Sequence, residues 1–539
     1  MIHRINWRSP TVVNAVIALW LVAAANLTFF RRLAALSPLD GWQATLFLFS
    51  ATVLLWAYIN FFLQLVTWGR LARPTLSFIL VASAVTAFFV DTYGVGIDAG
   101  QLQNALETDR REVFDLLSWQ LAAYLAVIAG LPLLWLWWRP QARTALWPRQ
   151  RARLLSCLLS LCLAGVVAAI YFADYASTFR NHREVRLLIN PHNYIAALSS
   201  HLRHASPAGD LPLIPYGDDA SRLQTTTAGK PVLMVLVVGE TARAESFGLN
   251  GYDRDTTPEL ARSQVLNFTR TSSCGTATAV SLPCMFSGFT RADYDARVAS
   301  HREGLLDILQ RAGYEVTWID NNSGCKGACA RVGQTPLLAS RRAAWCDAEG
   351  ECHDDILADT LDDLLRHAPV RDRVIVLHQA GSHGPAYYKR YPAAFRRFTP
   401  TCESNQLQSC PRQAVINTYD NTIAYTDHVL ARVIDLLQAQ DGRYRAAFWY
   451  VSDHGESTGE HGLYLHGAPY LFAPSQQTHV PMVAWFSPDF AADTRTDCIR
   501  ARQHAEVSHD NLFHTVLGLL HVHTGVYRQD LDISAACQA

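Results

Sequence analysis

The chain has 539 residues, of which 50% are hydrophobic and 17% are charged, and its formal net charge is −1. A net charge this close to zero gives no support for nucleic-acid binding, which needs a basic surface. The length allows two or three domains.

Five apolar runs without charged residues predict membrane-spanning helices. The first run is not closed by a small-residue cleavage site, so we interpret it as a retained helix and not as a signal peptide. The third, Thr75–Val90, has only 16 residues and should borrow flanking residues or bend near Pro74. The predicted helices span about 11–30, 42–69, 75–91, 119–138 and 154–173.

The distribution of arginines predicts the orientation of these helices. With the N-terminus inside, the inner segments carry nine arginines and the outer loops carry four. The outer loop 92–118 is also rich in acidic residues. Everything after Ala173 should therefore lie outside the cytoplasm, which for a bacterial inner membrane means the periplasm.

The twelve cysteines support this orientation independently. Cys157 and Cys162 lie in an apolar run, whereas the other ten all follow residue 270, mostly in close pairs. An even number of cysteines in one half of the chain predicts an oxidising compartment for that half. Zinc knuckles are the alternative for the pairs at 325–329 and 346–352, but the surrounding spacing does not repeat as it would in a zinc finger.

Two connecting segments follow the last predicted membrane helix. Asp174–Ser200 mixes charged and apolar residues and could form an interfacial amphipathic helix, which Pro191 would interrupt. Ala205–Gly229 is rich in Pro, Gly, Ser and Thr and is predicted to be a linker. We therefore predict a transmembrane domain at 1–173, an interfacial helix and linker at 174–229, and a catalytic domain at 230–539.

From Lys230 onward, short apolar strands alternate with helical patterns. This alternation predicts an α/β domain with a mostly parallel sheet. The expected helices cover 303–312, 356–365 and 417–440. The expected strands are Pro231–Val238, Tyr314–Ile319, Val374–His378 and Ala446–Val451.

Polar residues follow all four strands. Ligands of such sheets bind beyond the carboxyl ends of the strands. One polar strand end is usually structural, but four at one edge, together with a hydroxyl-rich loop, predict a metal site. That loop is Ser272–Ser287, and it is bounded by Cys274 and Cys284. The polar strand ends are Gly239–Arg243, Asp320–Lys326, His378–Pro385 and Ser452–Glu456.

Glu240, Asp453 and His454 offer two carboxylates and one imidazole, a donor set that suits zinc or manganese. The hydroxyl of Thr278 would complete a four-coordinate set. A metal at this position would lower the pKa of the hydroxyl and make it nucleophilic at neutral pH.

Five motifs resemble the membrane-anchored phosphoethanolamine transferases that modify lipid A, a family that includes the mobile colistin-resistance enzymes and belongs to the alkaline phosphatase superfamily. The resemblance covers the helices, the linker and the catalytic domain. The motifs are GETARAESFGLNGY at 239–252, SCGTATAVSLPCMFS at 273–287, DNNSGCKGAC at 320–329, SHGPAY at 382–387 and SDHGESTGEHGLYLHGAPY at 452–470.

The resemblance implies a role for each matching residue. Glu240, Thr278, Asp453 and His454 would bind one catalytic zinc, and Thr278, not the neighbouring Thr276, would be the nucleophile. His383 and His466 would bind the donor's phosphate or a second zinc. Asn322, Ser323 and Lys326 would line the ethanolamine-phosphate pocket, with Lys326 on the phosphate, because an ammonium group is a poor partner for lysine.

The resemblance also implies disulfides and an activity. The implied pairs are Cys274–Cys284, Cys325–Cys329, Cys346–Cys352, Cys402–Cys410 and Cys498–Cys537. The enzyme, expected to be a monomer in the bacterial inner membrane, would move phosphoethanolamine from phosphatidylethanolamine to a lipid A phosphate through a covalent intermediate on Thr278. The added amine would lower the negative charge of the outer membrane and give polymyxin resistance.

Other interpretations remain open at this point. A sulfatase shares the fold, but its nucleophile stands two residues before a proline and four before an arginine, and Met285 occupies the arginine position here. A glycerol-phosphate polymerase of the lipoteichoic-acid type also has five helices and a threonine nucleophile. A non-catalytic zinc-binding ectodomain is a third possibility. The acceptor could also be a lipopolysaccharide core sugar or another periplasmic glycan.

Overall fold

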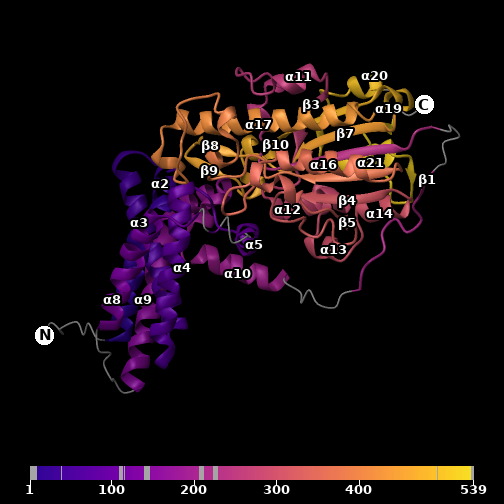
Figure 1. Ribbon diagram of the computed structural model, residues 1–539. Coiled ribbons are helices and arrows are strands. Elements are labelled where there is room, and N and C mark those ends of the chain that lie inside the picture. The colour runs from indigo at the N-terminus through magenta and orange to yellow at the C-terminus, as the bar shows by residue number, and fades with distance from the viewer. Residues whose placement is uncertain are drawn as a thin grey trace. The chain divides into compact units, whose positions relative to one another are not determined.

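The computed structural model of the chain describes residues 9–535 apart from 38, 108–112, 114–115, 139–145, 205–211, 223–228 and 495. The chain forms two compact units, one from 1–102 with 117–202 and one from 103–116 with 203–539. The first unit is helical and the second contains the sheet (Figure 1). Much of the predicted linker, at 205–211 and 223–228, lies outside the described residues.

Among the described residues, four helical segments are long and apolar enough to cross a membrane, and a bent pair makes a fifth if it is one span. The bent pair replaces the first predicted helix, with an angle of 57° between its halves. At the break, the buried Asn26 side chain donates hydrogen bonds to the carbonyls of Leu21 and Asn190. The segments are α1 (Pro10–Ala24) with α2 (Leu27–Ala35), α3 (Gly41–Val66), α4 (Ala72–Tyr93), α7 (Trp119–Leu125) with α8 (Leu131–Trp138), and α9 (Leu146–Asn181).

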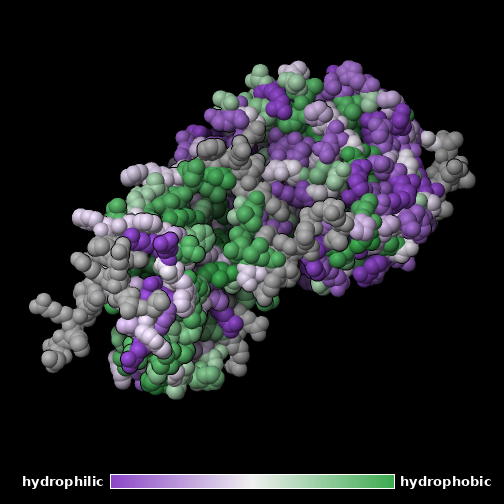
Figure 2. Space-filling model, turned by 90° about the horizontal axis from the view of Figure 1, so that it is seen from below, coloured by the Kyte–Doolittle hydropathy of each residue, from purple (hydrophilic) through white to green (hydrophobic). Residues whose placement is uncertain are grey.

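Two predicted spans are longer than expected. Helix α4 begins at Ala72 and ends at Tyr93, so it includes residues on both sides of the short apolar run, as predicted. Pro74 lies in its first turn, where the missing N–H of proline costs no hydrogen bond. Helix α9 extends the predicted span 154–173 at both ends. Its leucines 154, 155, 158, 159 and 161 are exposed, as expected for side chains that face lipid. Hydrophobic residues cover much of the surface of the helical unit, whereas hydrophilic residues predominate on the α/β unit (Figure 2).

The segment after the last span is not a single amphipathic helix. Helix α9 continues to Asn181, a 3₁₀ helix covers Arg183–Leu188, and α10 spans His192–His204. Pro191 separates the last two, as expected. Val185 is fully buried in the core of the helical unit, so this segment packs on protein as well as following the membrane helices.

The α/β unit is built on an eight-stranded sheet of order β11-β3-β10-β7-β2-β6-β4-β5. All neighbours are parallel except β10, which is antiparallel to both β3 and β7. The strands, in that order, are Val507–Ser508, Leu266–Ser272, His479–Phe486, Arg445–Ser452, Val232–Gly239, Arg373–His378, Glu315–Asp320 and Gly333–Gln334.

The four predicted strands form the contiguous centre of this sheet, β7-β2-β6-β4. Sequence reasoning missed β3, whose LNFTRTS sequence alternates apolar and polar residues. It also missed β10, in which Pro481 falls where the register with β3 shifts, a position where a strand tolerates proline.

Helices pack on both faces of the sheet. Alternate residues of β2 point to opposite sides, with Met234 and Leu236 in one core and Val235 and Val237 in the other. The helices α12 (Thr278–Ser287), α14 (Leu305–Arg311) and α21 (His509–Leu519) supply the first core, and α16 (Asp355–His367) and α17 (Arg412–Gln438) supply the second.

The hydroxyl-rich segment is only partly a loop. We expected a loop from Ser272 to Ser287, but helix α12 begins at Thr278. Its residues Leu282, Met285 and Phe286 repeat at helical spacing and are buried in the core. The dense Ser, Thr, Gly and Pro content of the segment concealed this short apolar stripe.

Candidate active site

The pairing of β2 with β7 brings the metal-ligand candidates together. Gly239 and Ser452 are paired at the ends of these two parallel strands. The chain then continues into Glu240 on one side and Asp453 and His454 on the other. Residues more than 200 positions apart in sequence therefore meet at the carboxyl edge of the sheet.

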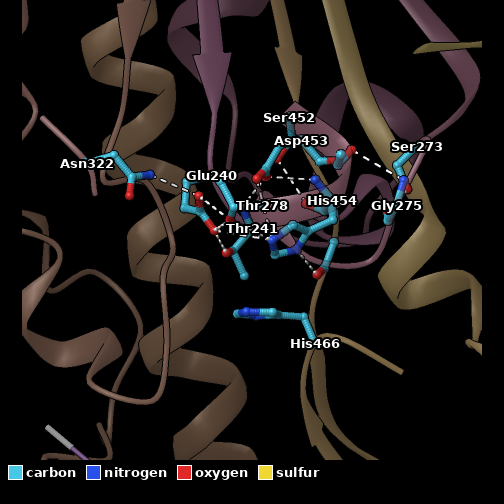
Figure 3. Close-up of polar contacts among 12 residues, drawn as sticks. Glu240, Thr241, Ser273, Gly275, Thr278, Asn322, Ser452, Asp453, His454 and His466 are labelled. Carbon is cyan, nitrogen blue, oxygen red and sulfur yellow. Dashed lines mark hydrogen bonds and ion pairs between the residues drawn. The ribbon is translucent and has the colours of Figure 1, made fainter. Parts of the chain in front are cut away.

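Glu240, Asp453 and His454 form a compact buried cluster whose ligand atoms all lie within 4.8 Å of one another. His454 Nε2 lies 3.3 Å from Glu240 Oε1 and 3.5 Å from Asp453 Oδ2. Figure 3 shows the three side chains converging next to Thr278. The side chains of all three residues are fully buried.

Thr278 is the first residue of helix α12, and its hydroxyl points into this cluster. Its Oγ1 lies 3.0 Å from Glu240 Oε2, 3.2 Å from Glu240 Oε1 and 3.3 Å from His454 Nε2. A helix amino terminus favours negative charge, so this position suits a hydroxyl that must become an alkoxide or carry a phosphoryl group. Thr276 points elsewhere, because its hydroxyl donates to the carbonyl of Ala468 at 2.7 Å.

Backbone and side-chain donors orient the two carboxylates. Glu240 accepts hydrogen bonds from the Thr241 hydroxyl and, at 2.9 Å, from the Asn322 amide. Asp453 Oδ1 accepts the backbone N–H groups of Thr241 and His454 at 3.2 and 2.7 Å. Asp453 Oδ2 is buried and accepts no hydrogen bond from the described part of the chain.

The His454 ring is held with one nitrogen available to a ligand. Its Nδ1–H donates to the carbonyl of Gly455 at 2.9 Å. This bond holds one proton on Nδ1 and turns Nε2 toward Glu240 and Thr278, so that a metal ion could replace the proton on Nε2, the usual arrangement of a metal-binding imidazole.

The electrostatics of the cluster favour the binding of a cation. Burial, together with repulsion from Glu240, raises the pKa of Asp453 to about 7. Burial also opposes ionisation of Glu240, but the hydrogen bond and charge of His454 outweigh it and hold the Glu240 pKa well below its ordinary value. Burial would lower the His454 pKa, yet Asp453 and Glu240 raise it to about 10. Without a metal, neutrality needs a proton on Asp453 as well as the one on His454, whereas a divalent cation neutralises both carboxylates in their ionised forms.

The donor set therefore fits a metal ion. Two carboxylates and an imidazole nitrogen lie together, the Thr278 hydroxyl contacts one of the carboxylates, and Asp453 Oδ2 has no hydrogen-bond partner in the described part of the chain. This mixture of oxygen and nitrogen ligands suits zinc or manganese better than calcium, which prefers oxygen alone.

His466 and His383 lie beside this cluster. The His466 ring centre is 4.3 Å from that of His454 and 5.6 Å from that of His383. His466 Nδ1–H donates to the buried carboxylate of Glu456 at 2.9 Å, which fixes the ring. The two histidines predicted to act together are thus adjacent to each other and to a metal-ligand candidate.

The segment after β4 carries Asn322, Ser323 and Lys326, and of these three residues, all within the described part of the chain, only Asn322 is hydrogen-bonded to the metal-ligand cluster. Asn322 bridges Glu240 and, at 2.8 Å, the carbonyl of Gln379, so it contacts the cluster directly. A cavity of about 230 Å³ is lined by Asn322, Ser323 and His383, among others. Lys326 has a left-handed φ of 47°, donates to the Ser323 carbonyl at 3.4 Å and lines a second cavity together with Ser323.

Sequence reasoning missed a second set of residues that supports the site. His509, at the start of α21, accepts the Cys274 N–H at Nδ1 and donates from Nε2 to the Ser452 carbonyl at 2.9 Å. The Ser281 hydroxyl donates to the carbonyl of Asp453. His509 stands more than fifty residues from the nearest metal-ligand candidate, and no local motif marks it.

The disulfides pair as the family resemblance implied. Four bonds are present, and Cys498 is also disulfide-bonded, although its predicted partner Cys537 lies outside the described residues. The Cys274–Cys284 bond ties the segment before Thr278 to the helix that follows it. Cys157 and Cys162 are free, as expected for the helical unit. The bonded pairs are Cys274–Cys284, Cys325–Cys329, Cys346–Cys352 and Cys402–Cys410.

Comparisons with known proteins agree with this geometry. A family profile described as "Phosphoethanolamine transferase EptA/EptB" matches residues 55–206, and one described as "Sulfatase" matches 233–522. Phosphoethanolamine transferase EptA of Salmonella typhimurium is 41% identical over 529 residues, covering 96% of this chain and 95% of the relative. Phosphatidylethanolamine transferase Mcr-1 of Escherichia coli is 38% identical and covers 95% of each chain.

A solved structure matches nearly the whole chain. The integral membrane lipooligosaccharide phosphoethanolamine transferase A from Neisseria meningitidis is 38% identical, covers 98% of both chains and superposes with a TM-score of 0.94. The shared length includes both the helical unit and the α/β unit. The chain therefore belongs to the EptA and Mcr family of phosphoethanolamine transferases, and is an inner-membrane protein whose α/β domain lies in the periplasm.

Proposed function

We propose that the protein transfers phosphoethanolamine from phosphatidylethanolamine to a phosphate of lipid A, through a covalent intermediate on Thr278. The observation that supports this most directly is the Thr278 hydroxyl, 3.0 Å from Glu240 and 3.3 Å from His454 at the amino terminus of a helix. The printed names of the relatives support the substrates: the Mcr proteins are phosphatidylethanolamine transferases, and another relative is a Kdo(2)-lipid A phosphoethanolamine transferase.

Zinc is the cofactor we propose for the cluster. A zinc ion held by Glu240, Thr278, Asp453 and His454 would lower the pKa of the Thr278 hydroxyl and neutralise the buried carboxylates. Asn322 and Thr241 would keep Glu240 oriented through their hydrogen bonds. The Gly455 carbonyl would keep the proton of His454 on Nδ1.

In the first step, Thr278 Oγ1 attacks the phosphorus of phosphatidylethanolamine in line. The bond from Thr278 oxygen to phosphorus forms, and the bond from phosphorus to the diacylglycerol oxygen breaks. Thr278 gives up its proton to water, and the departing diacylglycerol oxygen takes one up. We assign the equatorial phosphate oxygens to His383 and His466, and the amide of Asn322 and the ammonium of Lys326 to the pocket around the phosphoethanolamine group.

In the second step, a lipid A phosphate oxygen attacks the phosphorus held on Thr278. The bond from the acceptor oxygen to phosphorus forms, the bond from phosphorus to Thr278 Oγ1 breaks, and Oγ1 takes up a proton to become a hydroxyl again. Two steps suit two lipid substrates, because diacylglycerol can leave before the acceptor enters. The product carries an additional amine, so it lowers the negative charge of the outer membrane and weakens the binding of cationic peptides such as polymyxins.

The test uses the full-length enzyme in phosphatidylethanolamine bilayers without an acceptor. We expect intact-mass analysis to find a phosphoethanolamine increment, and peptide mapping to place it on Thr278. Thr276→Ala is the matched control, because Thr276 lies on the same segment but its hydroxyl bonds the Ala468 carbonyl. An increment on Thr276 or Ser281, or none in an enzyme that transfers normally, would contradict the assignment.

Two further measurements address the acceptor and the metal. Mass spectrometry of lipid A from cells with and without the protein should show the phosphoethanolamine adduct; an adduct found only on core sugars or another glycan would replace the acceptor. Chelation should abolish transfer, and zinc should restore it more effectively than manganese. A verified metal-free enzyme that stays fully active would exclude the proposed cofactor.

A further inference from the structure

A buried arginine stands at the cytoplasmic end of the helical unit. Arg153 is near the start of α9, whose far end leads to the periplasmic domain, so this end of the helix faces the cytoplasm. Only 4% of Arg153 is exposed. Its guanidinium lies over the Trp68 ring at 4.3 Å, and its Nη2 makes a long contact of 3.4 Å with the Thr67 hydroxyl.

Most of the hydrogen-bonding capacity of this guanidinium is unused. Neither Nε nor Nη1 of Arg153 has a hydrogen-bond partner within the described ranges. Arg149, one turn earlier on α9, also has a buried Nε without such a partner. A buried cation without hydrogen bonds is costly, so these donors indicate a ligand that accepts hydrogen bonds.

The charge around Arg153 shows which ligand would fit. The described parts of α1, α3, α4 and α9 contain two carboxylates, Asp91 and Asp174. Both lie toward the periplasmic ends of their helices, and Asp91 is already bonded to Thr28 and Tyr124. The cytoplasmic end therefore carries arginines and no carboxylate in the described helices, so an anion fits and a zwitterion would leave its ammonium unpaired.

A chain of polar side chains connects Arg153 to an apolar groove. The Asn14 amide donates to the Thr67 hydroxyl at 2.8 Å and to the Gln64 amide oxygen at 3.1 Å. Gln64 in turn donates to the Thr11 carbonyl at 3.1 Å and makes a long contact of 3.4 Å with the Ser156 hydroxyl.

Thr11 and Ser156 are the polar residues of a groove of about 380 Å³ on the helical unit. The Thr11 hydroxyl is buried and has no hydrogen-bond partner among the residues that the structure describes. The rest of the lining is apolar and comes from three helices. It consists of Val12, Ala15 and Val16 of α1, Trp56 of α3, and Leu155 and Leu159 of α9.

We propose that this end of the bundle binds an anionic diacyl phospholipid of the cytoplasmic leaflet. The phosphodiester would accept hydrogen bonds from Arg153, and an acyl chain would occupy the groove lined by Thr11 and Leu155. Basic pockets between membrane helices on the cytoplasmic side are a recognised mode of binding anionic lipids. This lipid is distinct from the substrates of the proposed reaction, which takes place in the periplasmic domain.

The test uses the full-length protein in nanodiscs of phosphatidylcholine containing a small fraction of phosphatidylglycerol. After release into detergent, native mass spectrometry counts the phosphatidylglycerol molecules retained per protein. We expect one tightly retained molecule, and a reduction of about tenfold or more in Arg153→Gln, the loss expected for hydrogen bonds to a charged group. Arg151→Gln removes the same charge from an exposed neighbour and should retain the lipid.

A second variant tests the contribution of the apolar groove to lipid binding separately from the contribution of the Arg153 charge. Ala15→Phe should fill the groove and reduce lipid retention while Arg153 is intact, and this result also decides the matter if Arg153→Gln does not fold. Inorganic phosphate at millimolar concentration should not displace the lipid. Equal retention in wild type and both variants, equal loss in Arg151→Gln, or full displacement by inorganic phosphate would each overturn the proposal.

Discussion

Two buried aspartates in different parts of the α/β domain differ in an instructive way. Asp427 lies on α17, and its two carboxylate oxygens accept the backbone N–H groups of Glu259 and Leu260 at 2.9 and 2.8 Å. Asp453 directly follows β7, and within the described residues only its Oδ1 accepts hydrogen bonds. Burial raises the pKa of each to about 7. The two aspartates therefore have similar pKa values although their carboxylate oxygens have different hydrogen-bond partners.

This difference in hydrogen bonding helps to distinguish buried polar residues that support the fold from buried polar residues that could bind a ligand. Asp427 is satisfied by the protein, and so is His509, whose two ring nitrogens bond the backbone. Asp453 has one oxygen that accepts no hydrogen bond from the described residues and that lies beside a second carboxylate and a hydroxyl, a position that suits a metal ion. Unused hydrogen-bonding capacity, and not burial or a shifted pKa alone, identifies the candidate metal centre.

The largest effect should come from Thr278, the proposed nucleophile, whose hydroxyl contacts the Glu240, Asp453 and His454 cluster through Glu240 and His454. Thr278→Ala removes the attacking oxygen, so we expect transfer to fall by about 10³-fold or more, as for other removed nucleophiles. Thr276→Ala should cost about tenfold or less, because that hydroxyl only bonds a loop carbonyl. Rates of donor cleavage and acceptor modification in lipid bilayers measure both. If Thr278→Ala cleaved the donor normally, the two-step order would be wrong.

The second-largest effect is expected from Asp453→Asn, and comparing it with Asp427→Asn tests whether the two aspartates have different roles. Asp453→Asn removes a charged ligand, so we expect metal affinity to fall by about 100-fold or more, with transfer lost accordingly. Asp427→Asn should leave metal content and transfer unchanged. Without metal, Asp453→Asn should be at least as heat-stable as wild type, because it ends the repulsion with Glu240. Metal analysis and thermal unfolding with and without chelator check this; equal metal loss in both variants would invalidate the distinction.

The centre of the fold could be predicted from sequence because its signal is local. The strands β7, β2 and β6 are almost entirely buried and read as short apolar runs, and β4 alternates polar residues with the buried Val316 and Trp318. Strands β3 and β10 could not be identified this way, because their polar residues and Pro481 make sense only after the register with their neighbours is known. The start of α12 was concealed for a similar reason, since its apolar stripe is short.

The candidate site could be predicted to the extent that its residues stand at strand ends. Glu240, Asp453 and His454 follow directly from the parallel pairing of β2 with β7. The choice of Thr278 over Thr276 came from family resemblance, and only the geometry separates the two hydroxyls physically. His509 could not be predicted, because its role depends on α21 packing behind a strand end that is distant in sequence.

A smaller effect is expected from His509, which belongs with Asp427 among the satisfied groups. His509→Ala leaves the Cys274 N–H and the Ser452 carbonyl unpaired in a buried place, which should cost about 1–3 kcal/mol of stability. Because His509 contacts no metal-ligand side chain, metal content should stay normal while transfer slows by about tenfold. His509→Gln retains a donor and an acceptor and should recover part of the loss. Loss of metal in His509→Ala would instead place it in the metal centre.

The smallest effect is the pH dependence caused by Asp427. Burial raises its folded-state pKa to about 7, whereas an unfolded aspartate titrates near 4. Between these values the folded state keeps a proton that the unfolded state has lost, so stability should fall as pH rises from about 4 to 7. Each unit of pKa shift corresponds to about 1.4 kcal/mol, an upper guide for a single residue. Asp427→Asn should flatten this slope, and it should be less heat-stable than wild type, because its NH2 group cannot accept one of the two backbone N–H bonds.

The matched control for this prediction is Asp435→Asn, which changes an exposed aspartate on the same helix α17. It should leave the pH dependence of thermal unfolding as it is in wild type. The measurements belong on enzyme supplied with zinc, because a metal bound at the proposed site would keep Asp453 ionised in the folded state and remove its raised pKa from the slope. A slope unchanged in Asp427→Asn would mean that the two backbone N–H groups compensate for burial, and that Asp427 is charged in the folded protein throughout this range.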